Sequence, residues 1–387
     1  MSKPSHLAFV DQVTVETLRA VPYLDVAGIG GRRVNLMAFW DGERWHMWIP
    51  MPAGNLMRMN PVEAMHLDYV AKAPASSNDL LIPFVEVMWQ HLSYEDICPL
   101  ISAICDTFHK MGTSVAKLRH LHRSRAVVGH ATSDYAATEI EYLAILSRTV
   151  YDLLQEAITR IWKNHVQLLD PVEEQRRKAS PLPDTFSRIV LRDKKLPRDS
   201  AEIASKFGLP AGVAATYAEL TPDFIALRDM RDRLIHAGAG VRHVYSTERG
   251  FCVDRTDPAF RGCTWTAVHK YNDNNLVSVL PWIANVVLKT IGACNSLLSS
   301  FASNLVLLPP IAPGYRVFVR GPSTDALLSV LAVFEGGSPW WSESEDGGES
   351  LDQRIRERAY YLWKQRPHGA GSDALAHWLG AEQIERG

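Results

Sequence analysis

The sequence predicts a mainly helical α+β protein, in which a central four-helix bundle follows an N-terminal β unit and precedes a C-terminal helical hairpin. Three observations support this fold class. Long stretches in the middle of the chain repeat apolar residues every three or four positions, as amphipathic helices do. A short β-favouring segment comes before them, and a stretch rich in Gly, Ser and acidic residues separates them from the last helical pattern.

Composition indicates a globular protein and excludes wholesale disorder. Hydrophobic residues make up 47% of the 387 residues, and the formal net charge is -2. So small a charge creates no overall field that attracts nucleic acid, and any RNA contact must come from local patches. No apolar run reaches the roughly 18 residues that a membrane span needs. The 5 cysteines form no C-x-x-C pair, which favours reduced thiols and a cytoplasmic location without a membrane partner.

An N-terminal β-containing unit is expected over residues 1–75. Two β-favouring runs within 33–51 flank Asp41 and Gly42, a pair typical of a tight hairpin turn. The tryptophans of these runs fit cross-strand packing better than a stacking platform for bases or sugars. They are Trp40, Trp45 and Trp48.

The helical bundle is expected over residues 90–305, with a hairpin inserted in it. Apolar spacing predicts two long helices, a charged and Pro-rich connection, a pair of short helices, a helix with a polar cluster, the hairpin and a long buried helix. In that order, the segments are 94–119, 135–169 closed by Pro171, 171–200, 200–220, 223–240, 241–255 and 275–304.

Three further segments follow the bundle. Residues 306–335 are expected to form a strand-helix extension. Residues 336–350 form a linker whose Gly, Ser and acidic residues should keep it out of the core. Residues 351–387 are expected to form a small helical hairpin held by Trp363 and Trp378.

The predicted helix 223–240 contains the most informative polar cluster. At about 100° per residue, Arg231 falls inside an apolar arc rather than opposite it. Asp232 and His236 lie four apart on the neighbouring polar flank, a spacing at which a carboxylate can hydrogen-bond an imidazole. An arginine in that arc requires a function or a partner from the helix 135–169. The arc comprises Phe224, Leu227, Met230, Leu234 and Ile235, the partners considered are Asp152 and Glu141, and Gly238 and Gly240 supply the helix stop.

An ordinary surface helix is the alternative explanation for this cluster. An arginine can extend past apolar neighbours into water, and a histidine near a helix carboxyl end is favoured by the helix dipole. Spacing alone favours this ordinary surface helix, because an arginine and a histidine five residues apart often occur by chance.

The order of helices and the hexapeptide RDRLIH, from Arg231 to His236, resemble the HEPN superfamily. Bundles of that superfamily carry an arginine, then Asn, Asp or His, and then a histidine at the end of the third helix. Asp232 takes the polar position here. The resemblance covers about residues 94–304, and the connection at 170–218 and the hairpin make this bundle longer than a minimal member.

This resemblance implies metal-independent RNA cleavage, in which a ribose 2′-OH attacks the adjacent phosphate. His236 is then the general base or acid, because an imidazole titrates close to working pH. Arg231 stabilises the developing charge on the phosphoryl oxygens, and Asp232 orients the imidazole. Two motifs typically meet across a dimer in this superfamily, so a homodimer is implied as well. A toxin or phage-defence protein, with an antitoxin or another partner protein, fits this class.

A basic stretch, KLRHLHRSR at 117–125, is the expected RNA-binding patch, although a solvated helix end explains it equally. Its cations are Lys117, Arg119, Arg123 and Arg125. No cofactor is expected. Nor is a metal ion, because no cysteine or clustered acid completes a site with His368 and His377.

The C-terminal residues 351–384 resemble a short bacterial domain of unknown function. Its pattern of I-R-x-R-A-Y-x-L-W, a Gly-containing turn and H-W-x-x-A-E is present here as IRERAYYLW and HWLGAE. The resemblance implies no activity, so the hairpin is expected to recruit a partner. A non-catalytic dimerising protein, which recruits partners through its β unit and this hairpin, is therefore the alternative to a ribonuclease.

Overall fold

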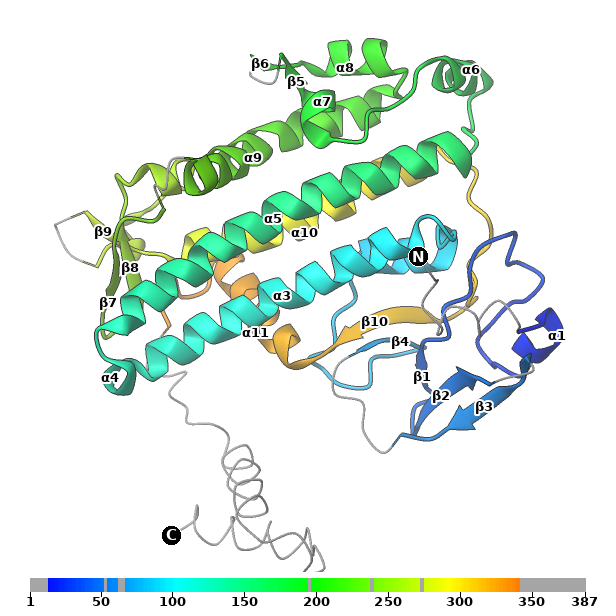
Figure 1. Ribbon diagram of the computed structural model, residues 1–387, viewed down its shortest axis with the longest axis horizontal. Coiled ribbons are helices and arrows are strands. Elements are labelled where there is room, and N and C mark those ends of the chain that lie inside the picture. Colours follow the sequence, from blue (N-terminus) through cyan, green and yellow to red (C-terminus); the bar gives the residue numbers. More distant parts are fainter. Residues whose placement is uncertain are drawn as a thin grey trace, which may run out of the picture.

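The computed structural model describes residues 13–51, 54–61, 67–193, 196–236, 240–271 and 275–341. Within these ranges the protein is α+β and mainly helical, as predicted. Four long helices lie side by side, with one sheet along a flank of the bundle and a smaller sheet across one end (Figure 1).

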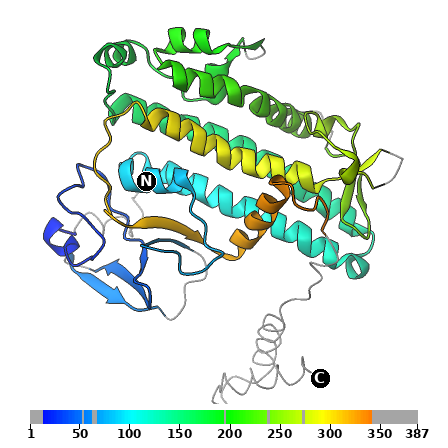
Figure 2. The same ribbon diagram turned by 180° about the vertical axis from the view of Figure 1, so that it is seen from behind.

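The four long helices are α3 (Cys98–Arg123), α5 (Ala131–Asn164), α9 (Ala211–His236) and α10 (Leu280–Ala302). Both α5 and α10 contact all of the other three, which makes them the centre of the bundle (Figure 2). Apolar residues at helical spacing produce this packing. On α5, for example, Leu143, Val150 and Leu154 lie on one face and are buried. The short helix α4 (Arg125–Val128) joins α3 to α5.

Helix α5 is shorter than predicted, and Pro171 does not close it. The helix ends at Asn164, and Pro171 is instead the first residue of α6 (Pro171–Ala179), whose N-cap Asp170 accepts hydrogen bonds from two backbone N–H groups. Proline suits a first helical position because its missing N–H is not needed there. Between the two helices, Leu169 N donates to Asn304 O at 2.9 Å, so tertiary pairing with the chain after α10 ends α5.

The connection to α9 is built from short elements: α7 (Phe186–Val190), β5 (Leu191–Arg192), β6 (Leu196–Pro197) and α8 (Ser200–Phe207). Two short helices were predicted in 200–220. The first is α8, but the second is not a separate short helix: its residues form the beginning of α9, which continues through Pro222. Proline inside a helix costs roughly 3 kcal/mol. Tyr217 and Phe224, both 0% exposed on either side of it, provide packing that outweighs this cost.

A five-stranded sheet contains the predicted hairpin. Strands β1 (Ala38–Trp40) and β2 (Trp45–Pro50) are antiparallel, and Trp40 lies opposite Trp45 with 4.9 Å between ring centroids. Cross-strand packing of these two tryptophans is therefore confirmed. The strand order is β10-β4-β1-β2-β3, where the remaining strands are β3 (Leu56–Met59), β4 (Leu67–Ala71) and β10 (Arg316–Arg320).

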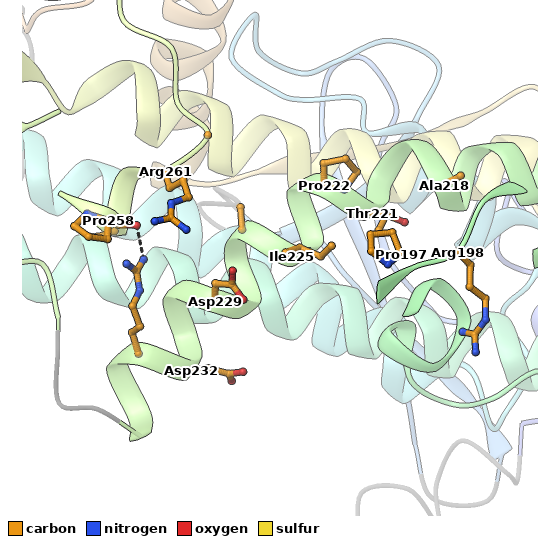
Figure 3. Close-up of a pocket in the computed structure, with 14 residues that line it drawn as sticks. Pro197, Arg198, Ala218, Thr221, Pro222, Ile225, Asp229, Asp232, Pro258 and Arg261 are labelled. Carbon is orange, nitrogen blue, oxygen red and sulfur yellow. Dashed lines mark hydrogen bonds between the residues drawn. The ribbon is translucent and has the colours of Figure 1, made fainter. Parts of the chain in front are cut away.

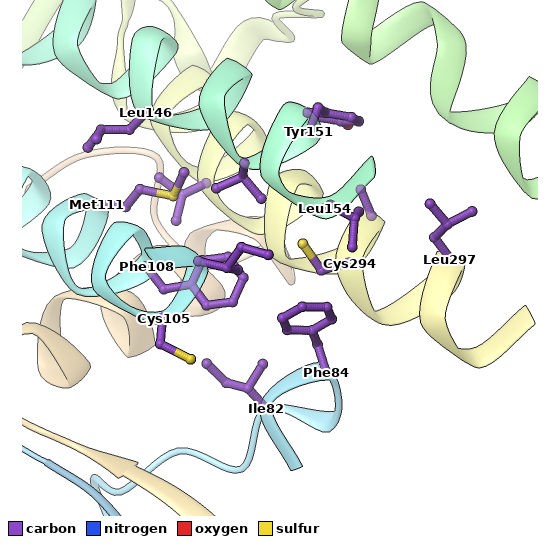
Figure 4. Close-up of a cluster of buried hydrophobic side chains, with 14 of the residues drawn as sticks. Ile82, Phe84, Cys105, Phe108, Met111, Leu146, Tyr151, Leu154, Cys294 and Leu297 are labelled. Atoms are coloured by element: carbon purple, nitrogen blue, oxygen red, sulfur yellow. The ribbon is translucent and has the colours of Figure 1, made fainter. Parts of the chain in front are cut away.

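One face of this sheet shares the main core with the helices. Phe39, Val70 and Val317 belong to the same hydrophobic cluster as the buried residues of α3 and α10, part of which Figure 4 shows. The other face forms a small separate cluster around Tyr69 and Phe318. Helix α1 (Val15–Leu18) precedes the sheet, and α2 (Pro83–His91) contacts both β10 and the long helices α3 and α10. Helix α11 (Pro322–Phe334) follows β10 and packs on α3 and α10.

The second sheet confirms the predicted hairpin at 241–255 and adds a strand to it. Strands β7 (Val244–Ser246) and β8 (Phe251–Asp254) are antiparallel, and β9 (Leu276–Ser278) pairs with β8. Two short 3-10 helices, η3 (Pro258–Phe260) and η4 (Ala267–His269), lie in the connection between β8 and β9.

The linker predicted at 336–350 was expected to stay out of the core, but Trp340 and Trp341 in its first part are buried. Trp340 and Trp341 are only 7% and 6% exposed. The indole Nε1 of Trp340 donates to Val268 O at 2.9 Å, and Trp341 packs edge-on against Phe251. Two adjacent indoles bury too much apolar surface to remain in water beside an apolar sheet. Residues 342–350 and the predicted hairpin at 351–387 lie outside the described residues.

Candidate functional site

Arg231 and Asp232 lie at the carboxyl end of α9 in a small cluster of surface charges. Arg231 Nη1 lies 3.3 Å from Asp232 Oδ1, and Arg228 Nε lies 3.4 Å from Asp232 Oδ2. The side chains of Arg231 and Asp232 are 42% and 38% exposed. Ion pairs this exposed contribute only about 0–1 kcal/mol to stability, so the cluster has little structural value.

The expectation that Arg231 lies within a packed apolar arc was wrong. Phe224, Leu227 and Met230 are buried, but Ile235 is 52% exposed. The last turn of α9 is thus only partly packed, since Leu234 still contacts the core, and among the described residues Arg231 pairs with Asp232.

The partners proposed for Arg231 on α5 have other contacts. Asp152 pairs with Arg148 at 2.6 Å. Glu141 Oε1 accepts a hydrogen bond from Val241 N at 2.9 Å, which fixes the chain just after α9. A side chain at Gly240 would collide with this carboxylate. The sequence interpretation expected Arg231 to be a buried arginine that needs a partner. The buried arginine at this place is instead Arg148, whose guanidinium stacks on Phe224.

His236 is the last residue of α9. Its side chain lies outside the described residues, as does the stretch 237–239 with Gly238. The predicted contact between Asp232 and His236 thus stays a prediction. Helical geometry places residues 232 and 236 one turn apart on the same side of α9.

A groove of about 950 Å³ runs along the outer side of α9 (Figure 3). Asp229 and Asp232 project from α9 into it, and Arg233 crosses to donate to Pro258 O at 2.6 Å. Arg261 follows η3 and lines the same groove. Its walls are mainly apolar and come from three parts of the chain, namely Pro197, Ala218, Pro222, Ile225, Ala226, Pro258 and Ala259.

A second cavity of about 420 Å³ adjoins this groove and shares Pro222 and Arg261 with it. Its polar groups include Lys289, whose Nζ is 3.0 Å from Asp223 Oδ1. Cys263 also lines it, and burial raises the pKa of this thiol to about 11. Because the thiolate is the reactive form, Cys263 is a poor nucleophile at neutral pH.

The four cations of the basic stretch do not share one helix face, since three lie on α3 and Arg125 begins α4. Lys117 pairs with Glu139 of α5 at 3.0 Å, and Arg125 donates to His122 O at 2.8 Å. Arg119 and Arg123 lie on a different side of the helix from Lys117, since two and six residues correspond to about 200° and 240° of rotation. The stretch therefore offers two separate small surfaces.

Arg233 and Arg261 were not among the site residues predicted from the sequence. Arg233 is part of the same hexapeptide as Arg231, so its position was visible. Arg261 follows α9 by 25 residues and reaches the groove only because the Pro- and Gly-containing turn at 258–262 folds back over the helix. No spacing rule brings these two residues together.

No group of three or more His, Cys, Asp or Glu residues is arranged to hold a metal ion in the described part of the chain. Within the same ranges, no helix is both long enough and apolar enough to cross a membrane.

One family model matches part of this chain. It is described as a protein of unknown function (DUF2934), and it matches residues 350–384. This agrees with the resemblance noted at 351–384, and all of the matched residues follow Trp341, the last described residue. Comparison with curated proteins and with solved structures finds no match.

Proposed function

We propose that this protein binds RNA and cleaves it without a metal ion, using Arg231, Asp232 and His236 at the carboxyl end of α9. The observation that carries the proposal is the exposed position of Arg231 beside Asp232, a carboxylate that itself lines a long groove. A guanidinium that contributes little to stability and faces water is available for a phosphate, which it binds through two parallel hydrogen bonds.

The proposed reaction needs a base and a group that stabilises negative charge. His236 takes the proton of the ribose 2′-OH, and the 2′ oxygen attacks the adjacent phosphorus. The bond to the 5′ oxygen breaks, which leaves a 2′,3′-cyclic phosphate, and the departing 5′ oxygen takes up a proton. Arg231 stabilises the phosphoryl oxygens during this step, and Asp232 holds both the guanidinium and the imidazole in position.

RNA cleavage in EDTA tests this proposal. Full-length protein is incubated with total RNA beside R231A and H236A, and cleavage is followed on a gel. Each variant should lose activity by about 10²-fold or more, as is usual when a charge-stabilising donor or a general base is removed. R255A is the matched control, because Arg255 is an exposed arginine in the turn after β8.

Loss of cleavage can be attributed to the site only if the variants fold like the wild type, so their folding is measured at the same time. Arg231 is half exposed, so R231A should keep the circular dichroism spectrum and melting temperature of the wild type. Cleavage by R231A or H236A at the wild-type rate would rule out the assignment. A large drop in the melting temperature of R231A would show that the arginine has a structural role instead.

A non-catalytic interaction protein is the second candidate, and the groove favours it. The walls along α9 are mainly apolar and include exposed Pro222 and Ala226, a surface that suits a partner protein. Under this alternative, wild-type protein leaves RNA intact in EDTA, and a substitution in the groove such as A226E removes a protein partner without affecting RNA.

A further inference from the structure

The described end of the chain is anchored on the carboxyl end of α3. The ring of Trp341 stacks on His122 with 5.8 Å between centroids. Trp340 is held beside it, since the guanidinium of Arg249 lies 4.1 Å from the centre of its ring. The residues that follow Trp341 therefore start from a defined place, next to the basic stretch 117–125.

Arg119 and Arg123 lie on the side of α3 that faces α11 at Gly112. Helix α11 packs tightly on α3 at Gly112, where an added Cβ would lie 2.6 Å from Ser323 O. Positions 119 and 123 are seven and eleven residues further on, so they lie within about 20° of the same helical face. Arg123 is exposed. The buried Nε of Arg119 has no hydrogen-bond partner among the described residues.

The segment immediately after Trp341 has the complementary charge. Residues 342–350 read SESEDGGES, which contains four acids and no Lys or Arg. At about 3.3–3.6 Å per residue, nine residues extend at most roughly 30 Å, so the segment can cover the last turns of α3. The acids are Glu343, Glu345, Asp346 and Glu349.

We propose that residues 342–350 dock on the face of α3 formed by Arg119 and Arg123, as an intramolecular electrostatic contact. The tether at Trp341 raises the local concentration of the acids at this face, which makes several weak ion pairs sufficient. The proposal does not depend on RNA cleavage.

Zero-length cross-linking on the full-length chain tests this contact. A carbodiimide joins a carboxylate to a lysine amine only when the two are in contact, and R123K supplies an amine at the proposed face while keeping its charge. Mass spectrometry should find position 123 joined to one or more of Glu343, Glu345, Asp346 and Glu349. The link should decrease strongly between 0.1 M and 1 M salt, as the Debye length falls from about 10 Å to about 3 Å.

Lys117 provides two internal controls on the same helix. Its link to Glu139, 3.0 Å away, shows that the reaction has worked. Links from Lys117 to the acidic segment measure random encounters, because Lys117 is on another side of α3. We expect about tenfold more coupling to position 123 than to Lys117, since docking raises the effective concentration at one face only. Equal coupling to both positions, or none to position 123 when Lys117 and Glu139 are joined, would overturn the proposal.

Discussion

The arginines of this protein differ in burial: Arg148 and Arg198 are buried and hold the fold together, whereas Arg231 is half exposed. Arg198 is 8% exposed, pairs with Glu202 at 2.9 Å and donates to Arg188 O at 2.9 Å, so it ties the connection 188–202 together. Arg148 is also buried and stacks on Phe224. Arg231, in contrast, is half exposed and gains little from its neighbour Asp232. The arginine selected by the sequence pattern is thus the one that the fold does not need.

Glu174 gives a residue-level prediction on acid stability. Its carboxylate accepts hydrogen bonds from Arg177 and from Leu168 N, and Lys178 lies 3.2 Å away. The Arg177 guanidinium is the main reason why the pKa of Glu174 is lowered from 4.5 to about 2. A pKa lowered in the folded state stabilises the protein above the unfolded pKa, and this stabilisation is lost as the pH falls through the folded pKa.

We therefore expect E174Q to lower the free energy of unfolding by about 1–3 kcal/mol at pH 7, the usual cost of removing a charged hydrogen-bond partner. The difference from the wild type should shrink between pH 4.5 and about 2. Denaturant unfolding at a series of pH values measures it. E173Q, on the preceding residue of α6, is the control. A difference for E174Q that does not change with pH would contradict the assignment.

At the scale of elements, the contact between α3 and α11 depends on the absence of a side chain at Gly112. A Cβ there would lie 2.6 Å from Ser323 O and 3.2 Å from Leu327 Cγ. The backbone oxygen cannot move away without shifting α11. Helix α11 follows β10 of the first sheet and precedes Trp341, which stacks on His122 of α3. The close contact at Gly112 therefore lies between these two points of the fold.

G112A should accordingly destabilise the protein by about 1–3 kcal/mol, as overpacking in a core usually does. Gly212 is the matched control, because it is also helical and a Cβ added there would meet nothing within 4 Å. There the removal of glycine flexibility should stabilise by up to about 1 kcal/mol. Urea unfolding midpoints compare the two variants. Equal effects in the same direction would mean that the helices can separate freely at Gly112.

At the scale of the whole molecule, Trp340 and Trp341 are the last two described residues, and both are buried. Truncation before Leu351 should leave the melting transition almost unchanged. Truncation before Pro339 should lower it by several degrees, because each buried tryptophan contributes roughly 1.5–3 kcal/mol. Scanning calorimetry of the two truncations measures the difference. A large loss already in the shorter truncation would show that the tail is docked through its own aromatic residues.

The oligomeric state is the second prediction at this scale. The resemblance to the HEPN superfamily implies a dimer in which two Arg/His motifs meet, and one motif supplies few donors for a phosphate and both reacting oxygens. Light scattering should then give about twice the monomer mass of 43.3 kDa. A monomer at micromolar concentration that still cleaves RNA would contradict a composite site.

The sequence by itself determined the elements whose signal is local. Apolar spacing located α3, α5 and α10, and the turn residues at Asp41 and Gly42 located the hairpin, because side-chain periodicity and backbone preference act over a few neighbouring residues. The same reasoning placed Arg231, Asp232 and His236 on one helix. It also recognised the C-terminal pattern that the family model matches at 350–384.

Only the tertiary structure decided what depends on residues far apart in the chain. Helix α9 continues through Pro222 because Tyr217 and Phe224 on either side of it are buried. Helix α5 ends before Pro171, where Leu169 pairs with Asn304. Arg231 proved half exposed, although its helical position matched the apolar arc and Leu234 in the same turn packs on the core. Trp340 and Trp341 packed beside the second sheet against the composition of their own segment. For α9, α5 and these two tryptophans, the free energy of packing against a distant partner outweighed the local preference.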